Sequence, residues 1–309
     1  MSREYLDYWG LNKEPFHLAP DNEMLYLGGQ YYECFERLLY AVNTNKGGAL
    51  LVSEEAGLGK TTILLKLVAE MEWNYGKNFS HAFIDHPTLT IAQLMSQISA
   101  SLLLSEPKGD KFLNLSRIKE RLIELKEAGG KAIVIVDEAH TLCNRPEVLQ
   151  DLRMLLNLTH EKEYLFTMIL SGQKALWEEM KRIPEFWQRL PVKYYLLPLR
   201  LEETRNLVNH RLSKAGCDED REIFTAESFE IIQRFAHGLP RTIVALCDLC
   251  LLVGSAYQAR RIGYKEVSKA INAMSGKGEV EDIAVGGAPA RQEEPSFLRS
   301  LLNRFKGRN

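Results

Sequence analysis

A glycine-rich loop between an apolar run and a helical segment carries the clearest chemistry in this sequence. Residues 57–62 read Gly-Leu-Gly-Lys-Thr-Thr and follow the apolar run 49–53. A loop that holds phosphate must expose its backbone N–H groups, so it needs glycine, and the helix that follows adds its positive dipole end. Lys60 would reach the β- and γ-phosphates of ATP, and the Thr61 hydroxyl would ligate Mg²⁺. The predicted nucleotide contacts are Gly57, Leu58, Gly59, Lys60, Thr61 and Thr62.

One position departs from the full phosphate-loop pattern, which is G-x-x-x-x-G-K-[ST]. Its first glycine is replaced by Glu54, while Gly57 and Gly59 are kept. A glutamate here is predicted either to strain the start of the loop or to place a carboxylate near the phosphates. A nucleotide switch that binds ATP without hydrolysing it is therefore one alternative for this sequence.

A pair of carboxylates follows a second apolar run. Residues 131–136 are apolar after the first position and rich in β-branched side chains, as expected of a strand that is covered on both faces. Asp137 and Glu138 come directly after this run. At such a strand end the first carboxylate holds Mg²⁺, and the second orients and deprotonates the attacking water. We assign the first role to Asp137 and the second, that of the general base, to Glu138.

A polar strand end supplies a third candidate group. The mostly apolar run 165–171 leads into Ser171-Gly172-Gln173. A polar side chain at this point would lie between the paired carboxylates and the γ-phosphate. Ser171 and Gln173 both suit that position, and the sequence does not choose between them.

Two arginines are placed where they would stabilise charge on the transferred phosphoryl group. Arg189 ends a helical segment before the last predicted strand, and from there it would face the γ-phosphate of a neighbouring subunit. Arg241 follows Gly238-Leu239-Pro240, in which proline suits a first helical turn and glycine frees the turn before it. Arg241 is therefore predicted to point from a lid back toward the phosphates.

The elements that position these groups alternate between strands and helices. Strands are predicted at 49–53, 81–85, 131–136, 165–171 and 193–197. Helices are predicted at 31–43, 61–71, 91–104, 115–127 and 148–157. This alternation indicates a parallel sheet with helices on both faces. The predicted fold class is therefore α/β: a P-loop sheet domain followed by a small all-helical lid.

The character of the chain changes near residue 201. The segments 202–215, 225–237, 240–258 and 264–274 all have helical patterns, which predicts a separate lid at 201–274. Before it, the chain divides into a leading segment at 1–46 and an ATPase core at 47–200. The leading segment is predicted to be an ordered loop of 30 residues followed by the first helix. After it, residues 275–295 have few large apolar side chains and are predicted to be a disordered linker.

The tail at 296–309 combines an apolar helical face with basic residues. The apolar residues on that face are Phe297, Leu298, Leu301, Leu302 and Phe305. The basic residues are Arg299, Arg304 and Lys306. A basic amphipathic segment of this kind suits an anionic membrane or the groove of a membrane-associated partner. The alternative is a short helix that folds back onto the body.

Charge and cysteine content exclude several protein classes. The 309 residues carry a formal net charge of −2, so DNA binding is allowed but not favoured. Five cysteines argue against a secreted disulfide framework, and Cys247 and Cys250 lie in an apolar segment typical of a core helix. The amino terminus lacks a signal-peptide pattern, and no run is long enough to span a membrane. We expect a cytoplasmic protein, peripheral at the inner membrane if the tail binds lipid.

As an ordered set, these motifs resemble the AAA+ ATPases of the general secretion pathway protein A type. The resemblance covers roughly residues 5–274 and begins with an amino-terminal signature. That signature is seen here as Tyr8-Trp9-Gly10-Leu11, Pro15-Phe16, Pro20-Asp21 and Tyr26. It continues through residues 57–62, 137–140, 152–158, 171–173, 188–189, 210–212 and 238–241.

The resemblance implies hydrolysis of ATP, with Mg²⁺ as cofactor, in a homo-oligomer that forms a ring or a filament. Arg189 would act in trans as an arginine finger, and Arg241 would be the lid sensor. The amino-terminal segment would supply part of the adenine pocket, for which the candidates are Phe16, Tyr26 and Leu27. The implied role is a motor or switch in assembly of a bacterial envelope or secretion structure. The alternative is a DNA-associated AAA+ ATPase that regulates transposition or target selection.

Overall fold

Two compact units make up the chain in the computed structural model, which describes residues 2–19, 21–85, 87, 90–103, 111–218 and 220–276. Among these residues, the sheet unit spans 21–197, and the helical unit combines 2–19 with 198–276. The predicted leading segment 1–46 is thus divided between the two units. The predicted linker from residue 277 onward and the predicted tail helix at 296–309 lie outside the described residues.

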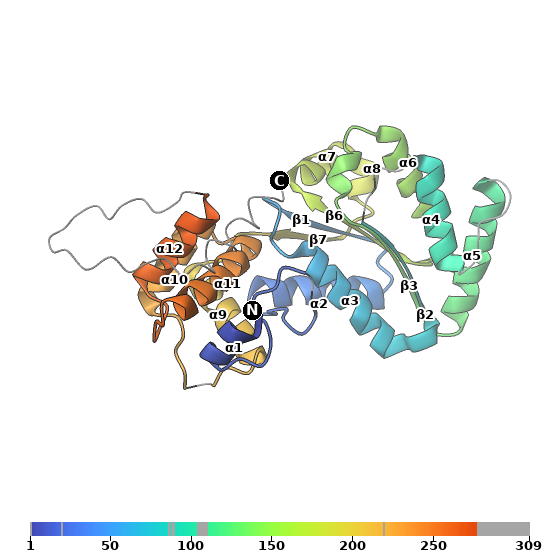
Figure 1. Ribbon diagram of the computed structural model, residues 1–309. Coiled ribbons are helices and arrows are strands. Elements are labelled where there is room, and N and C mark those ends of the chain that lie inside the picture. Colours follow the sequence, from blue (N-terminus) through green and yellow to red (C-terminus); the bar gives the residue numbers. More distant parts are fainter. Residues whose placement is uncertain are drawn as a thin grey trace. The chain divides into compact units, whose positions relative to one another are not determined.

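Five parallel strands form the central sheet of the sheet unit, in the order β2-β3-β6-β1-β7 (Figure 1). Their bounds are Gly48–Ser53 for β1, Phe79–Ile84 for β2, Lys131–Val136 for β3, Thr167–Gln173 for β6 and Val192–Leu196 for β7. All five predicted strands are confirmed, with ends within about two residues of the prediction. The short antiparallel pair β4 (Thr159–His160) and β5 (Glu163–Tyr164) is not predicted by the sequence pattern.

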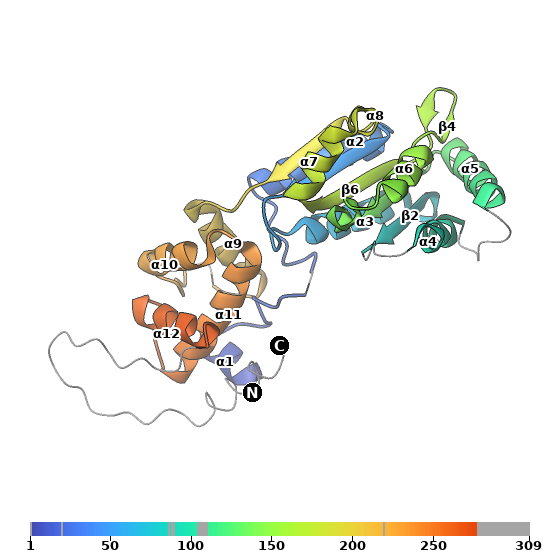
Figure 2. The same ribbon diagram turned by 90° about the horizontal axis from the view of Figure 1, so that it is seen from above.

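Helices cover both faces of this sheet (Figures 1 and 2). On one face, α2 (Gln30–Asn43) and α3 (Lys60–Tyr75) contact the strands. The other face is covered by α4 (Ile91–Leu103), α5 (Lys111–Glu127), α6 (Pro146–Leu155), α7 (Lys174–Arg182) and α8 (Pro184–Trp187). Two short 3₁₀ turns complete the unit, η1 (Gly76–Asn78) and η2 (Ala139–Leu142).

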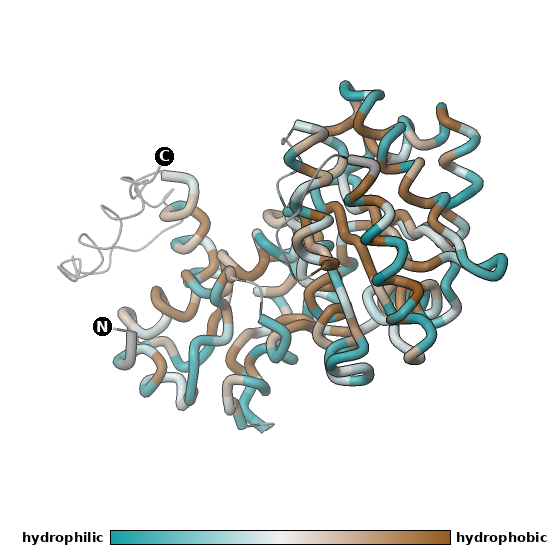
Figure 3. The backbone as a smooth tube through the Cα atoms, turned by 90° about the vertical axis from the view of Figure 1, so that its right-hand side faces the viewer, coloured by the Kyte–Doolittle hydropathy of each residue, from teal (hydrophilic) through white to brown (hydrophobic). Residues whose placement is uncertain are grey.

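Side-chain alternation along the strands brings polar residues to the face where α3 begins. Three apolar residues in the carboxyl-terminal parts of their strands belong to the core on the α4–α8 side: Val52, Val136 and Leu170. Because successive strand residues point to opposite faces, the residues that follow them point to the α2–α3 side: Ser53, Asp137 and Ser171. The strands themselves are apolar, brown in Figure 3, and β3 is buried along nearly its whole length.

Four helices of the helical unit match the predicted lid. They are α9 (Leu201–Lys214), α10 (Ala226–Ala236), α11 (Pro240–Ala256) and α12 (Tyr264–Met274), with ends within about two residues of the predicted ones. The thiols of Cys247 and Cys250 are fully buried in α11, and burial raises the pKa of both. Their assignment as core residues is confirmed. None of the helices in the described ranges is long and apolar enough to cross a membrane.

The helix α1 (Ser2–Trp9) corrects the prediction of an ordered loop at the amino terminus. Leu6 and Trp9 are buried, and the indole Nε1 of Trp9 donates a hydrogen bond to the Leu251 carbonyl of α11 at 2.8 Å. The Tyr8 hydroxyl donates to the Ala259 carbonyl at 2.9 Å. Two helical turns are too short for a clear sequence periodicity, so tertiary packing of this kind stabilises them.

Candidate active site

The phosphate loop joins β1 to α3. Ser53 ends β1, and α3 begins at Lys60. Gly57 and Gly59 have φ angles of 84° and 83°, in the left-handed region that favours glycine. Because α3 starts directly after the loop, the first N–H groups of this 16-residue helix have no partner within the helix. The backbone therefore presents the anion-binding turn that the glycines predict.

Lys60 is buried beside this turn, with 4% of its surface exposed. Its Nζ donates a hydrogen bond to Ser53 Oγ at 2.8 Å, and Ser53 Oγ donates to the Glu55 carbonyl at 2.6 Å. Burial lowers the pKa of Lys60, while the carboxylates of Glu138 and Asp137 raise it. The sequence reading missed Ser53, although its place as the last strand residue before the loop was a usable signal.

A hydrogen bond joins the loop to the paired carboxylates. Thr61 Oγ1 donates to Asp137 Oδ2 at 2.5 Å, between residues that are 76 positions apart. Asp137 is 2% exposed, and its Oδ1 accepts the backbone N–H of Glu138 at 2.9 Å. Mg²⁺ prefers oxygen ligands, and a hydroxyl and a carboxylate oxygen in contact at the loop fit that preference. Thr61 and Asp137, the two predicted metal ligands, therefore lie together.

Glu138 has a backbone conformation that is rare for a residue with a side chain. Its φ angle is 50°, in the left-handed region, where strain costs about 1–3 kcal/mol and persists when the surroundings fix it. The Thr141 hydroxyl fixes the turn by donating to the Glu138 carbonyl at 3.0 Å. The Glu138 carboxylate is 41% exposed, and its Oε2 lies 3.4 Å from His140 Nδ1. The backbone thus aims an accessible carboxylate from the end of β3.

Of the two effects predicted for Glu54, strain of the loop start is absent from this structure, and a carboxylate near the phosphates stays a prediction. The φ angle of Glu54 lies outside the left-handed region. The Glu54 side chain therefore does not strain the start of the loop. Its carboxylate accepts a hydrogen bond from Lys174 Nζ at 2.7 Å and another from the Tyr195 hydroxyl. The carboxylate therefore has partners outside the phosphate loop.

Ser171 and Gln173, the two candidates at the end of β6, differ in their surroundings. Val136 pairs with Leu170 across β3 and β6, so one step further Ser171 comes opposite Asp137. Ser171 is fully buried, and its Oγ has no hydrogen-bond partner among the described residues. Gln173 is half-buried, lies beside Ser53 of β1 and precedes α7. We expect Ser171 to be the group that contacts the reacting phosphate.

Replacing Ser171 by Ala is expected to lower kcat for ATP by about tenfold, the value of one hydrogen bond made in the transition state. The unfolding temperature should stay within about 2 °C, because the hydroxyl has no protein partner to lose. Steady-state ATPase assays and thermal denaturation check both statements. Gln173→Ala is the matched control and should change kcat by less than about threefold. A larger loss in Gln173→Ala than in Ser171→Ala would transfer the role to Gln173.

Arg189 lies at the end of β1 that is opposite to the phosphate loop. A Cβ atom added to Gly48, the first residue of β1, would be 2.8 Å from the Arg189 carbonyl oxygen. A strand rises about 3.3 Å per residue, so the six residues of β1 separate Gly48 from Ser53 by roughly 17 Å. The Arg189 guanidinium donates a hydrogen bond to Asn157 Oδ1. Arg189 is too far from the loop of its own chain to contact it.

Arg241 lies in the first turn of α11 in the helical unit. Gly238 has a φ angle of 74°, and a Cβ atom on it would be 2.2 Å from the Leu199 carbonyl oxygen, so both backbone angle and space require glycine there. Pro240 occupies the first helical turn, as predicted. The Arg241 side chain is exposed, and the described residues give it no hydrogen bond or ion pair. It is available to an external anion.

The three candidates for the adenine pocket fall in both units. Phe16 belongs to the helical unit, where it is buried and packs edge-on against Phe224 with ring centroids 6.2 Å apart. Tyr26 and Leu27 belong to the sheet unit and are half-buried. The ring of Tyr31, in α2, lies 3.6 Å from where a Cβ atom on Gly59 would be. Tyr31 is thus an aromatic residue beside the phosphate loop, and no local sequence signal marks it.

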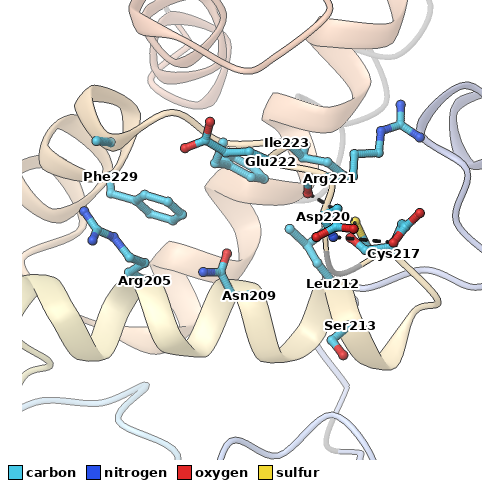
Figure 4. A pocket seen from close by; sticks show the side chains of 13 residues that line it. Arg205, Asn209, Leu212, Ser213, Cys217, Asp220, Arg221, Glu222, Ile223 and Phe229 are labelled. Atoms are coloured by element: carbon cyan, nitrogen blue, oxygen red, sulfur yellow. Dashed lines mark hydrogen bonds between the residues drawn. The ribbon is translucent and has the colours of Figure 1, made fainter.

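A separate pocket lies in the helical unit, within residues 205–229 (Figure 4). Its volume is about 450 Å³, and Arg205, Asn209 and Leu212 of α9 form one wall. Phe229 of α10 faces them, and the Arg205 guanidinium lies over its ring at 5.6 Å from the centroid. None of the predicted nucleotide-binding or catalytic residues lines this pocket.

Comparison with known proteins shows the family of the chain. A family model described as "AAA domain" matches residues 43–180. General secretion pathway protein A of Aeromonas hydrophila is 32% identical over 277 residues, which are 88% of this chain and 49% of that protein. The chain thus spans about half the length of the curated relative that it matches.

Several solved structures have backbones similar to that of this chain. The Aeropyrum pernix ORC1 protein, solved in complex with DNA, matches with a TM-score of 0.64 at 16% identity, over 85% of this chain and 70% of that chain. The Thermotoga maritima RuvB Holliday junction branch migration motor matches with a TM-score of 0.54 at 17% identity, over 86% and 76% of the two chains. At these identities the likeness shows a shared fold.

Proposed function

Because the chain is an AAA+ ATPase related to general secretion pathway protein A, we propose that it is an oligomeric motor or switch in the assembly of a bacterial envelope or secretion structure. The observation that supports its ATP site most directly is the Thr61–Asp137 hydrogen bond of 2.5 Å. It joins the phosphate loop to the strand-end carboxylates, and Lys60 lies buried beside both.

The residues of the loop bind and orient the triphosphate. Backbone N–H groups of residues 57–62 contact its oxygens, and Lys60 exchanges Ser53 for the β- and γ-phosphates. Thr61 and Asp137 would hold Mg²⁺. When bound, Mg²⁺ neutralises charge on the β- and γ-phosphate oxygens. Phe16, Tyr26 and Leu27 are the proposed adenine contacts.

Glu138 performs the proton transfer of the reaction. Its carboxylate takes a proton from water as the water oxygen bonds to the γ-phosphorus, and the bond from that phosphorus to the β–γ bridging oxygen breaks. The products are ADP and inorganic phosphate. Ser171 hydrogen-bonds the γ-phosphate during this step, with Gln173 as the other candidate.

Two arginines complete the site. Arg189 comes from the sheet unit of a neighbouring copy, and Arg241 comes from the helical unit. Arg189 acts on the ATP of a neighbouring copy, because in its own chain it lies at the opposite end of β1. Arg241, exposed and without an ion pair among the described residues, approaches the phosphates from the lid. The reaction therefore depends on a homo-oligomer. One copy of the chain binds each ATP, and a neighbouring copy supplies Arg189.

In our proposal the client of this ATPase lies at the envelope. The ATPase itself lies on the cytoplasmic side of the inner membrane. The relative's printed name supports the secretion role, and the basic amphipathic tail at 296–309 is the proposed contact to anionic lipid or a membrane-associated partner. The competing role is a DNA-associated regulator of transposition or target selection, which the net charge of −2 does not favour.

Stimulation of the ATPase tests the choice of client. Turnover should rise at least about twofold with vesicles that contain anionic lipid and stay unchanged with neutral vesicles, because a basic segment gains binding energy near an anionic surface. Deletion of residues 296–309 should abolish vesicle binding and leave the basal rate unchanged. Duplex DNA in the same assay should have no effect. Strong stimulation by DNA that falls steeply with salt concentration would contradict the envelope role.

A further inference from the structure

Glu54, the residue in place of the first loop glycine, has two partners from different elements. Lys174 Nζ, at the start of α7, donates to Glu54 Oε1 at 2.7 Å. The hydroxyl of Tyr195, on β7, donates to Glu54 Oε2. Val52 pairs with Tyr195 between β1 and β7, so Tyr195 lies directly beside the start of the phosphate loop.

The protonation of this cluster is defined at neutral pH. The hydrogen bond from Lys174, followed by that from Tyr195, lowers the pKa of Glu54, so Glu54 is a carboxylate. Burial and the Glu54 carboxylate raise the pKa of Tyr195 to about 12. Tyr195 therefore donates its proton to a charged acceptor, which is the stronger class of hydrogen bond.

An aromatic series continues from Tyr195 to the segment of Arg189. The Tyr195 ring meets Trp177 of α7 edge-on, with centroids 5.6 Å apart at 85°. Trp177 meets Trp187 of α8 in the same manner, at 5.2 Å and 87°. All three rings are partly buried against the core. Edge-to-face pairs of this geometry are attractive beyond their buried area, so the contacts are specific.

Trp187 is fixed close to Arg189 along the chain and in space. The Leu190 N–H donates to the Trp187 carbonyl at 3.3 Å, which places Arg189 inside a turn that begins at Trp187. Lys193 Nζ lies over the Trp187 ring at 4.3 Å from its centroid. Lys193 and Tyr195 are two residues apart on β7 and so share one side of the strand. Side chains on this edge strand thus bridge the loop end and the Arg189 end of the sheet.

We propose that Glu54 and Tyr195 are positioning residues. They couple ATP in the phosphate loop of one chain to the position of Arg189 in the same chain, and this Arg189 acts on the ATP of a neighbouring copy. A triphosphate adds negative charge next to the loop start and repels the Glu54 carboxylate. The repulsion favours the position in which the carboxylate contacts Lys174 and Tyr195. This fixes the Tyr195 ring against Trp177 and, through Trp187, the turn that carries Arg189. The proposal rests on the trans role of Arg189 given under the proposed function.

The test removes one oxygen atom and keeps every ring. Tyr195→Phe should lower kcat about fivefold with KM for ATP unchanged, since the aromatic packing and the loop remain. Tyr75→Phe is the matched control, because it removes a hydroxyl that bonds Asn43 at 3.2 Å elsewhere in the sheet unit. That variant should keep the kcat of the unmodified protein. In an Arg189→Ala background, Tyr195→Phe should lower kcat by less than about 1.5-fold, because the two substitutions interrupt one route.

A spectroscopic readout accompanies the kinetics. In the Glu138→Gln background, where ATP persists, ATP should change tryptophan emission, and Trp177→Phe should remove most of that change. Tyr195→Phe should reduce the change by more than about half, and Tyr75→Phe should not.

The outcomes separate the two levels of the proposal. Normal kcat in Arg189→Ala would overturn the trans role and the coupling together. A collapse of kcat in Arg189→Ala combined with fully additive loss in the double variant would overturn the coupling alone. Unchanged kcat and emission in Tyr195→Phe would do the same.

Discussion

Replacing Glu138 by Gln should lower ATP turnover by on the order of 10²-fold or more while ATP still binds. The amide keeps the size of the side chain but cannot take a proton from water. Folding should be unaffected, because the hydrogen bonds that fix this turn involve the backbone of Glu138 and not its carboxylate. Steady-state ATPase assays and equilibrium binding of a fluorescent ATP analogue measure the two effects separately.

Glu147→Gln is a suitable control for Glu138→Gln, since Glu147 is an exposed acid on α6 that pairs with Arg145 at 3.7 Å. It should retain the full rate. Near-normal turnover in Glu138→Gln would remove Glu138 as the general base and would direct attention to its neighbour His140.

Replacing Arg189 by Ala should lower kcat by about 10³-fold, at the lower end of what arginine fingers contribute. Because Arg189 lies roughly 17 Å along β1 from its own loop, the loss should be repaired by another copy of the chain. Arg189→Ala and Glu138→Gln are each inactive alone, but a mixed oligomer joins an intact Glu138 in one copy to an intact Arg189 in the next. Mixing the two purified variants should therefore restore measurable ATPase activity.

The control for Arg189→Ala is Arg182→Ala, at a surface position on α7 whose side chain is 76% exposed and pairs with Glu179. It should leave both kcat and the mixing result unchanged. If the mixture of Arg189→Ala and Glu138→Gln stays inactive while both variants co-assemble, Arg189 does not act in trans.

The elements that position the site could be predicted from the sequence because their signals are local. The apolar run of β3 ends at Asp137, and the glycines of the loop sit at φ angles of 84° and 83°, so pattern and backbone agree. Pro240 and Gly238 likewise mark the start of α11 by their own backbone requirements. Such features depend on a few consecutive residues, and these positions needed no knowledge of distant contacts.

The side-chain partners of the site could not be predicted, because they join distant parts of the chain. Glu54 meets Lys174 and Tyr195 across 120 and 141 positions, and no periodicity records which polar groups the strand order brings together. Strain, one of the two effects predicted for Glu54, does not occur, because its φ angle lies outside the left-handed region. The ring of Tyr31 beside Gly59 also depends on the packing of α2 against α3.

The indole of Trp9, bonded to the Leu251 carbonyl of α11, has a consequence for how the protein is made. The helical unit combines the first 19 residues with residues from 198 onward. Its amino-terminal residues are therefore synthesised before the helices against which they pack. Folding of this unit during translation can finish only after α11 has left the ribosome. A shortened protein that lacks α1 would lose the Trp9 bond and expose the surface of α11 that α1 covers, although its sheet would be complete.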